Sequence, residues 1–116
     1  MTTYKRGDIV LAWFPHSDLR TYKLRPALVV QADNLGTGIA QVVLALITTN
    51  RARLGHRSRV FVPQVWPNGT PSGLTSDSVV VTDNLATVLE KALDRVVGTL
   101  PDMTPVDIAL RHTLGV

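Results

Sequence analysis

The side chains of this sequence that could do chemistry are its three histidines, its arginines and its threonines. There is no cysteine, which excludes thiolate nucleophiles, disulfides and cysteine-based metal sites. The histidines are far apart in sequence and no carboxylates are spaced with them as ligands, so we expect no metal. The glycines are scattered, without a phosphate-cradling motif between a strand and a helix. We therefore expect neither a metal nor a cofactor.

Each histidine has a structural interpretation beside a catalytic one. His112 falls in the last turn of a predicted helix, where positive charge is favourable to the backbone dipole. His56 lies in a loop that is rich in arginine. His16 follows a predicted strand, in the kind of loop that often displays catalytic groups, and is therefore our candidate for a general base.

The charge is unevenly divided along the chain. Residues 1–59 hold nine Lys and Arg against three Asp, whereas residues 60–116 hold three against six acidic residues. This division predicts a basic face that attracts phosphate, although an ordinary solvated surface is the alternative. Aromatic residues make up only 5% of the chain, which argues against a platform for stacking bases.

Arginine and threonine are sufficient for one kind of phosphate chemistry. The 2′-hydroxyl of RNA can attack the adjacent phosphate, so the protein needs to supply neither a nucleophile nor a metal. It must align the chain and stabilise the charged transition state. Arginine offers forked donors to phosphate oxygens, and a threonine at a strand end places a hydroxyl on a rigid element.

The elements that must position these groups are mostly β-strands. Three apolar runs are typical of central strands, and three more runs predict further strands. Turn-forming residues at 67–73 predict a mobile surface loop. Residues 85–92 are ambiguous between a helix and an extended segment. The expected strands are residues 8–14, 27–31, 41–47, 60–62, 78–82 and 94–100.

The last stretch predicts one helix that ends before Gly115. Thr104 is the expected cap, Pro105 suits the first position, and Asp107 can answer the cap. Met103 and Ile108 are expected to pack as a hydrophobic staple, and the expected buried face consists of Val106, Ala109, Leu110 and Leu114.

Together these elements predict a mainly β fold with a C-terminal helix, in the form of a small, partly open barrel. No linker or repeat divides residues 1–116, which we expect to form a single domain. There is no signal-peptide pattern and no apolar run long enough to span a bilayer, so we expect a cytoplasmic protein without a membrane partner.

Several ordered motifs resemble the MazF/PemK toxins. Residues 7–10 (GDIV) open the first strand, residues 23–30 (KLRPALVV) open the second, and residues 46–49 (LITT) close the third. Further matches follow in the second half of the chain at residues 72–74, 77–80, 84–88 and 114–115. The resemblance therefore spans nearly the whole sequence.

The resemblance implies a fold, an activity and partners. The fold would be the Src-homology-3-like barrel shared with CcdB, and the unit would be a homodimer. The activity would be metal-independent, sequence-specific endoribonuclease cleavage of single-stranded RNA that leaves a 2′,3′-cyclic phosphate and a 5′-hydroxyl. The uneven charge adds the expectation of an acidic antitoxin that covers the basic surface.

The resemblance also implies site residues. The family's catalytic arginine corresponds to Arg25 and its catalytic threonine to Thr48; the structural alternatives are a surface ion pair for Arg25 and a strand-end hydrogen bond for Thr48. The loop at residues 16–23 lacks the Gly and Glu of many members, so no acidic role is transferred to it. Residues expected to line the RNA path are Arg20, Lys23, Thr49, Arg51, Arg53 and Arg57.

Two other functions remain open at this point. A CcdB-like protein would share the barrel but poison a topoisomerase by binding, without nuclease chemistry. A second alternative is a nucleic-acid-binding barrel that has no catalytic activity.

Overall fold

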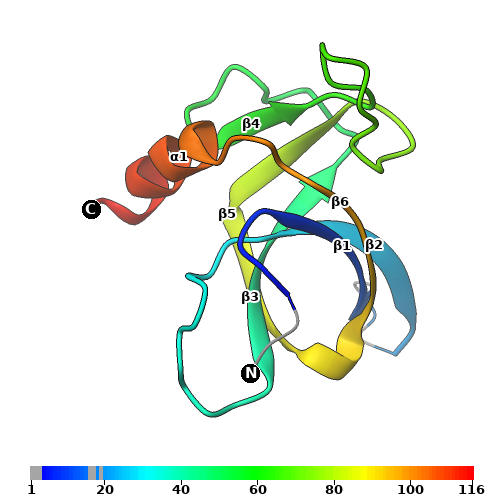
Figure 1. Ribbon diagram of the computed structural model, residues 1–116, viewed down its shortest axis with the longest axis vertical. Helices are drawn as coiled ribbons and strands as arrows, with labels where there is room; N and C mark the ends of the chain where they lie inside the picture. The colour runs from blue at the N-terminus through cyan, green and yellow to red at the C-terminus, as the bar shows by residue number, and fades with distance from the viewer. Residues whose placement is uncertain (1–3, 16–17, 19) are drawn as a thin grey trace.

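The computed structural model describes residues 4–15, 18 and 20–116. Six strands, a short 3-10 helix and one C-terminal α-helix follow each other along the chain (Figure 1). Their bounds are β1 Asp8–Pro15, β2 Tyr22–Val29, β3 Gln41–Thr48, β4 Arg59–Val62, β5 Ser78–Leu89, η1 Glu90–Ala92, β6 Leu93–Thr99 and α1 Thr104–Leu114.

The six strands form one antiparallel sheet in the order β4-β5-β3-β2-β1-β6. The sheet curls around itself without closing, and α1 lies beside β4 and the first half of β5 (Figure 1). The predicted mainly β fold with a partly open barrel and a C-terminal helix is confirmed. None of the helices that the structure describes is long and apolar enough to cross a membrane.

Alternation along the central strands divides the core between two faces of the sheet. In β3, Ala45 and Ile47 belong to a cluster that also contains Val106 of α1. Val42 and Leu44 belong to a second cluster inside the curl, with Val10 of β1 and other small apolar side chains. One face is therefore covered by the helix, and the other is the interior of the open barrel.

Strand β5 departs most from the sequence prediction. The expected strand at residues 78–82 continues to Leu89, which resolves the ambiguous segment as strand followed by the short helix η1. Its pairing with β3 jumps from Leu46↔Val81 to Ala45↔Leu85. Residues 82–84 therefore form a bulge without a partner on β3, and such bulges re-aim side chains beside functional sites.

The helix corrects several expectations about its ends. Thr104 is the first helical residue rather than the cap; the cap position is Met103, which makes no side-chain capping bond. Instead the Asp102 carboxylate accepts the Thr104 N–H at 2.9 Å, and this bond lowers the pKa of Asp102. The predicted end is confirmed by Gly115, which adopts a left-handed conformation at φ 72°.

The buried face of α1 is also narrower than expected. Val106 and Ala109 are buried and Leu110 packs against the core, whereas Leu114 is exposed. Ile108 is 61% exposed while Met103 packs into the core, so the predicted hydrophobic staple between them is wrong.

The loop that follows β4 is anchored where it meets β6. Ser72 is fully buried, and its hydroxyl donates to the Gln64 carbonyl at 2.9 Å. A Cβ added at Gly73 would lie 2.0 Å from the Val97 carbonyl oxygen, and one at Gly98 would lie 1.9 Å from the Ser72 carbonyl oxygen. Only glycine permits this approach of the two backbones.

Candidate functional site

Arg25 and Thr48 lie at the same end of the sheet, on neighbouring strands. The ladder between β2 and β3 ends at Ala27↔Leu46, and the same register continued by two residues places Arg25 opposite Thr48. Alternation also assigns both residues to the barrel-interior face, because Ala27 and Leu44 pack there. Each of the two residues thus lies two positions beyond the last pair of this ladder, on the rim of the open barrel.

The two side chains differ in how their polar groups are used. Arg25 is half-buried and forms no ion pair or side-chain hydrogen bond with the residues described, so the expected alternative of a surface ion pair finds no support there. The Thr48 hydroxyl accepts the Asn50 N–H at 3.1 Å, which is the strand-end bond expected of a structural threonine. Its hydrogen has no acceptor within the described chain and remains available to donate.

An open cavity of about 390 Å³ begins at Thr48. Leu46 and Val81 form its apolar part, and polar side chains from the loop after β3, from β4 and from the bulge of β5 form the rest. Arg25 does not line this cavity. The lining residues are Leu46, Thr48, Asn50, Arg53, Arg59, Val81, Asp83 and Asn84; we refer to it as the bulge cavity.

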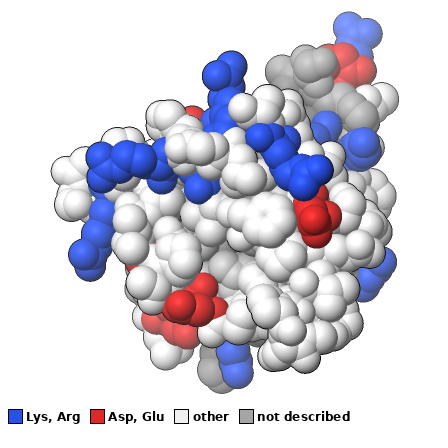
Figure 2. Space-filling model, turned by 90° about the horizontal axis from the view of Figure 1, so that it is seen from above, with Lys and Arg blue, Asp and Glu red and all other residues white. Residues whose placement is uncertain are grey.

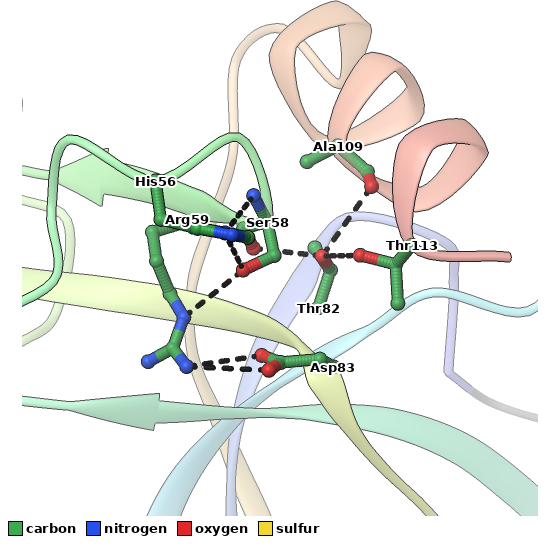
Figure 3. Close-up of polar contacts among 7 residues, drawn as sticks. All are labelled: His56, Ser58, Arg59, Thr82, Asp83, Ala109 and Thr113. Atoms are coloured by element: carbon green, nitrogen blue, oxygen red, sulfur yellow. Dashed lines mark hydrogen bonds and ion pairs between the residues drawn. The ribbon is translucent and has the colours of Figure 1, made fainter. Parts of the chain in front are cut away.

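The β5 bulge supplies two polar lining residues that the sequence analysis did not identify as site residues, Asp83 and Asn84. Arg59 of β4 holds Asp83: its Nη2 lies 3.2 Å from Oδ1 and 3.3 Å from Oδ2 (Figure 3). The only signal for this site in the sequence is the polar run Thr82-Asp83-Asn84, which interrupts an otherwise apolar strand.

Behind this ion pair, a network of hydrogen bonds joins the sheet to α1 (Figure 3). The Arg59 Nε donates to the Ser58 hydroxyl at 3.2 Å, and His56 Nδ1 accepts the Ser58 N–H at 3.1 Å. The buried Thr82 hydroxyl lies 2.7 Å from the Ser58 carbonyl oxygen and 2.8 Å from the Thr113 hydroxyl. Arg59 is therefore fixed from behind by groups that are themselves held in place.

All the residues predicted to line an RNA path are basic except Thr49. Figure 2 shows Lys and Arg gathered along one side of the face that it draws. Arg20, Lys23 and Thr49 are exposed beside the two strand ends. Arg53 lines the bulge cavity, whereas Arg51 lies 4.0 Å from Asp77. Of the described residues, none forms an ion pair with Arg20, Lys23, Arg53 or Arg57.

Arg57 belongs to a second, more open groove rather than to the bulge cavity. It shares this groove with Ile108, Arg111 and His112 at the end of α1. The His112 ring lies 5.9 Å from the ring of His56. The structure therefore divides the expected RNA path into a part at Thr48 and a part beside the helix.

The first loop is described only in part. His16, the candidate base, lies outside the described residues. Asp18 accepts the N–H groups of Arg20 and Thr21, at 2.9 and 3.2 Å, and these bonds lower the pKa of its carboxyl. Across the residues described, no group of three or more His, Asp or Glu is placed to hold a metal ion.

This chain is similar to known proteins over most of its length. Residues 5–114 match the family model for the PemK-like, MazF-like toxin of type II toxin-antitoxin systems. The chain is 35% identical over 103 residues to endoribonuclease MazF2 of Mycobacterium bovis and to endoribonuclease MazF6 of Mycobacterium tuberculosis. Each alignment covers 86% of this chain and 86% of the relative.

Solved structures show the same fold over almost the full length. A mycobacterial endoribonuclease in complex with its cognate antitoxin superposes with a TM-score of 0.73 at 26% identity, covering 98% of this chain and 97% of that one. The Mycobacterium tuberculosis toxin MazF-mt6 gives 0.65 at 29% identity, with 93% and 92% covered. With the family model spanning nearly all its residues, this chain belongs to the PemK-like, MazF-like toxins of type II toxin-antitoxin systems.

Proposed function

We propose that this toxin is a sequence-specific, metal-independent endoribonuclease that cuts single-stranded RNA at the rim formed by Arg25 and Thr48. The proposal is supported by the register between β2 and β3: continued by two residues beyond the last pair, Ala27↔Leu46, it would set Arg25 and Thr48 opposite each other. Both retain donors that the described chain does not use, and Thr48 lines the bulge cavity. Its relatives are named endoribonucleases.

The reaction requires little covalent chemistry from the protein. The 2′-oxygen of one nucleotide attacks the adjacent phosphorus and the bond from phosphorus to the 5′-oxygen breaks, which leaves a 2′,3′-cyclic phosphate and a 5′-hydroxyl. The guanidinium of Arg25 neutralises the pentavalent phosphorane and donates a hydrogen bond to the leaving 5′-oxygen, which takes up a proton from water. Thr48 is a weak base and acts by positioning the phosphate through its free hydroxyl hydrogen.

The basic residues around the rim bind the rest of the RNA. Arg20 and Lys23 flank the start of β2, and Thr49, Arg51 and Arg53 follow β3. Arg57 contacts the RNA farther along its strand, near α1. Single strands are the substrate because sequence reading needs base edges, which A-form duplexes hide in a deep, narrow major groove. A fully paired copy of a cleaved sequence, cut as fast as the single strand, would contradict this.

The partners follow from the same surface. An acidic antitoxin that folds on binding would cover the basic rim and compete with RNA; inhibition that persists unchanged in high salt would argue against it. The toxin acts as a homodimer in the cytoplasm, which sedimentation of the purified protein and fractionation of its host cells would test.

The decisive experiment is cleavage of a long single-stranded RNA by the purified protein in the presence of a chelator. We expect discrete fragments that carry a 2′,3′-cyclic phosphate and a 5′-hydroxyl. RNA binding without cleavage would favour the non-catalytic barrel. Neither binding nor cleavage, together with inhibition of a topoisomerase, would favour the CcdB-like alternative.

We propose His16 as the base that removes the 2′-hydroxyl proton, on the sequence alone. Imidazole titrates close to neutrality, so the cleavage rate should fall as the pH is lowered through that range. His16→Ala should abolish this limb of the profile. An unchanged profile in the variant would remove His16 from the reaction.

A further inference from the structure

We propose that the bulge cavity seats one base of the RNA and that Asp83 selects a base with an exocyclic amino group, that is cytosine, adenine or guanine rather than uracil. The inference rests on the proposed function, because the cavity begins at Thr48 and a base placed in it belongs to a nucleotide near the cleaved phosphate.

The cavity has the size and chemistry of a small-ligand site. Its volume of about 390 Å³ lies within the range of such sites, which combine an apolar wall with a few fixed polar groups. Leu46 and Val81 can contact the face of a ring. The amides of Asn50 and Asn84 and the carboxylate of Asp83 can meet its edge.

Asp83 gives this edge a preference. An ionised carboxylate only accepts hydrogen bonds, and its two oxygens together offer about four lone-pair directions. One nitrogen of Arg59 approaches both oxygens, at 3.2 and 3.3 Å, and leaves the other directions open. The Asp83 side chain is 46% exposed, against 18% for Arg59. The carboxylate is thus the more accessible partner of the ion pair.

The four bases differ in what they bring to such an acceptor. Cytosine and adenine present an amino group, and guanine presents an amino group beside a ring N–H. Uracil has one N–H between two carbonyl oxygens, which would be held against a carboxylate of the same charge sign. Asp83 therefore favours the binding of a base with an amino group and disfavours the binding of uracil.

The carboxylate is also held firmly enough to discriminate. Arg59 is anchored through Ser58, whose carbonyl accepts the buried Thr82 hydroxyl at 2.7 Å. Asp83 follows Thr82 directly in the bulge, so its backbone is fixed from the helix side (Figure 3). A selective contact depends on this kind of preorganised support.

The first test uses the wild-type protein and modified RNA. Cleavage of a pool randomised around the cut should reveal one position where cytosine, adenine or guanine is preferred over uracil by about tenfold to a hundredfold. Removing the amino group from the preferred base should cost a similar factor. Equal cleavage with uracil at every position would overturn the inference while leaving the nuclease activity intact. No cleavage of any RNA would overturn the proposed function and the inference together.

The second test uses Asp83→Asn, which keeps the shape of the side chain but adds a donor. We expect the preference over uracil to fall by about tenfold or more at that one position, with other positions unchanged. The amino-deleted RNA should no longer be a poorer substrate for this variant. Asp94→Asn is the matched control, since Asp94 is also paired with an arginine, Arg95, but lies on β6 away from the cavity. A preference retained in Asp83→Asn, or lost equally in Asp94→Asn, would contradict the assignment.

Discussion

Two polar regions of this protein use their hydrogen-bonding groups in opposite ways. At the rim, formed by Arg25, Thr48 and Arg53, donors are left without acceptors in the described chain. At the seam, formed by Ser58, Thr82 and Thr113 between the sheet and α1, the Thr82 hydroxyl is fully buried and has partners on both sides. The rim lies at strand ends, whereas the seam lies between packed elements.

This difference separates what each region contributes. A buried polar group without partners destabilises a protein, so the seam must be satisfied for the fold to be stable. The donors at the rim belong to half-buried or exposed residues, so water can solvate them and they cost little when they have no partner in the protein. We therefore expect rim substitutions to change the reaction with little effect on stability, and seam substitutions to do the reverse.

The largest expected effect is that of Arg25→Ala on RNA cleavage. Loss of a preorganised donor to a transition-state oxyanion typically slows a reaction by about 10²–10³-fold, and we expect at least this loss in single-turnover rate. Arg25→Lys should recover little, because one ammonium lacks the forked geometry. Urea unfolding should give nearly the wild-type midpoint. A folded Arg25→Ala protein that cleaves at the wild-type rate would show that the site assignment is wrong.

Thr48→Ala should have a smaller effect on the rate than Arg25→Ala. The hydroxyl carries no full charge, and Thr48→Ser should keep much of the activity because it keeps the donor. In the proposed mechanism both residues act on one phosphate, so the double variant should be slower by less than the product of the single effects. Multiplicative effects in the same single-turnover assay would instead place the two side chains in separate roles.

Thr82→Val should change stability rather than chemistry. It removes the buried hydroxyl and leaves the Thr113 hydroxyl without this partner, which typically costs about 1–3 kcal/mol in the free energy of unfolding. Thr82→Ser keeps the hydroxyl and serves as the control. We expect the urea midpoint to fall while the cleavage rate per folded molecule stays near wild type on RNA that carries the preferred base, because Thr82 supports the base contact of Asp83 and does not touch the reacting phosphate. A large loss of rate with an unchanged midpoint would remove the distinction between the two regions.

The smallest effect should come from a polar contact outside both regions. The Arg6 guanidinium lies 2.6 Å from the carboxylate of Asp107, and both side chains are partly exposed. Asp107→Asn should therefore lower the free energy of unfolding by no more than about 1 kcal/mol. The difference from wild type should shrink in high salt, and a loss larger than that of Thr82→Val would contradict the ranking.

The strands could be predicted because their apolar runs are long and their ends carry turn residues. β1 and β3 agree with the sequence prediction to within one residue at either end. β2 begins at Tyr22, five residues earlier than expected, because its polar first half pairs with the end of β1. That pairing is a tertiary contact, which the local pattern of residues 22–26 does not encode.

The candidate site was only partly predictable for a related reason. Arg25 and Thr48 were predicted as site residues because they lie in motifs whose order resembles that of a known family. Asp83 became a candidate only through the shift in pairing between β3 and β5, and periodicity within one strand does not reveal such a shift. The predicted capping role of Asp107 in α1 was wrong for a similar reason. Its carboxylate accepts a hydrogen bond from Arg6, which lies near the other end of the chain.

The β5 bulge also determines how this protein can vary. Residues inside a ladder are constrained by their neighbours on both sides, and a change of length there moves every later side chain to the other face. Residues 82–84 lie outside the ladder with β3, and of these only Thr82 is buried. Asp83 and Asn84 can therefore be exchanged while the strands on either side keep their register. A library of substitutions confined to these two positions would sample new base preferences while the strand pairing of the barrel stays unchanged.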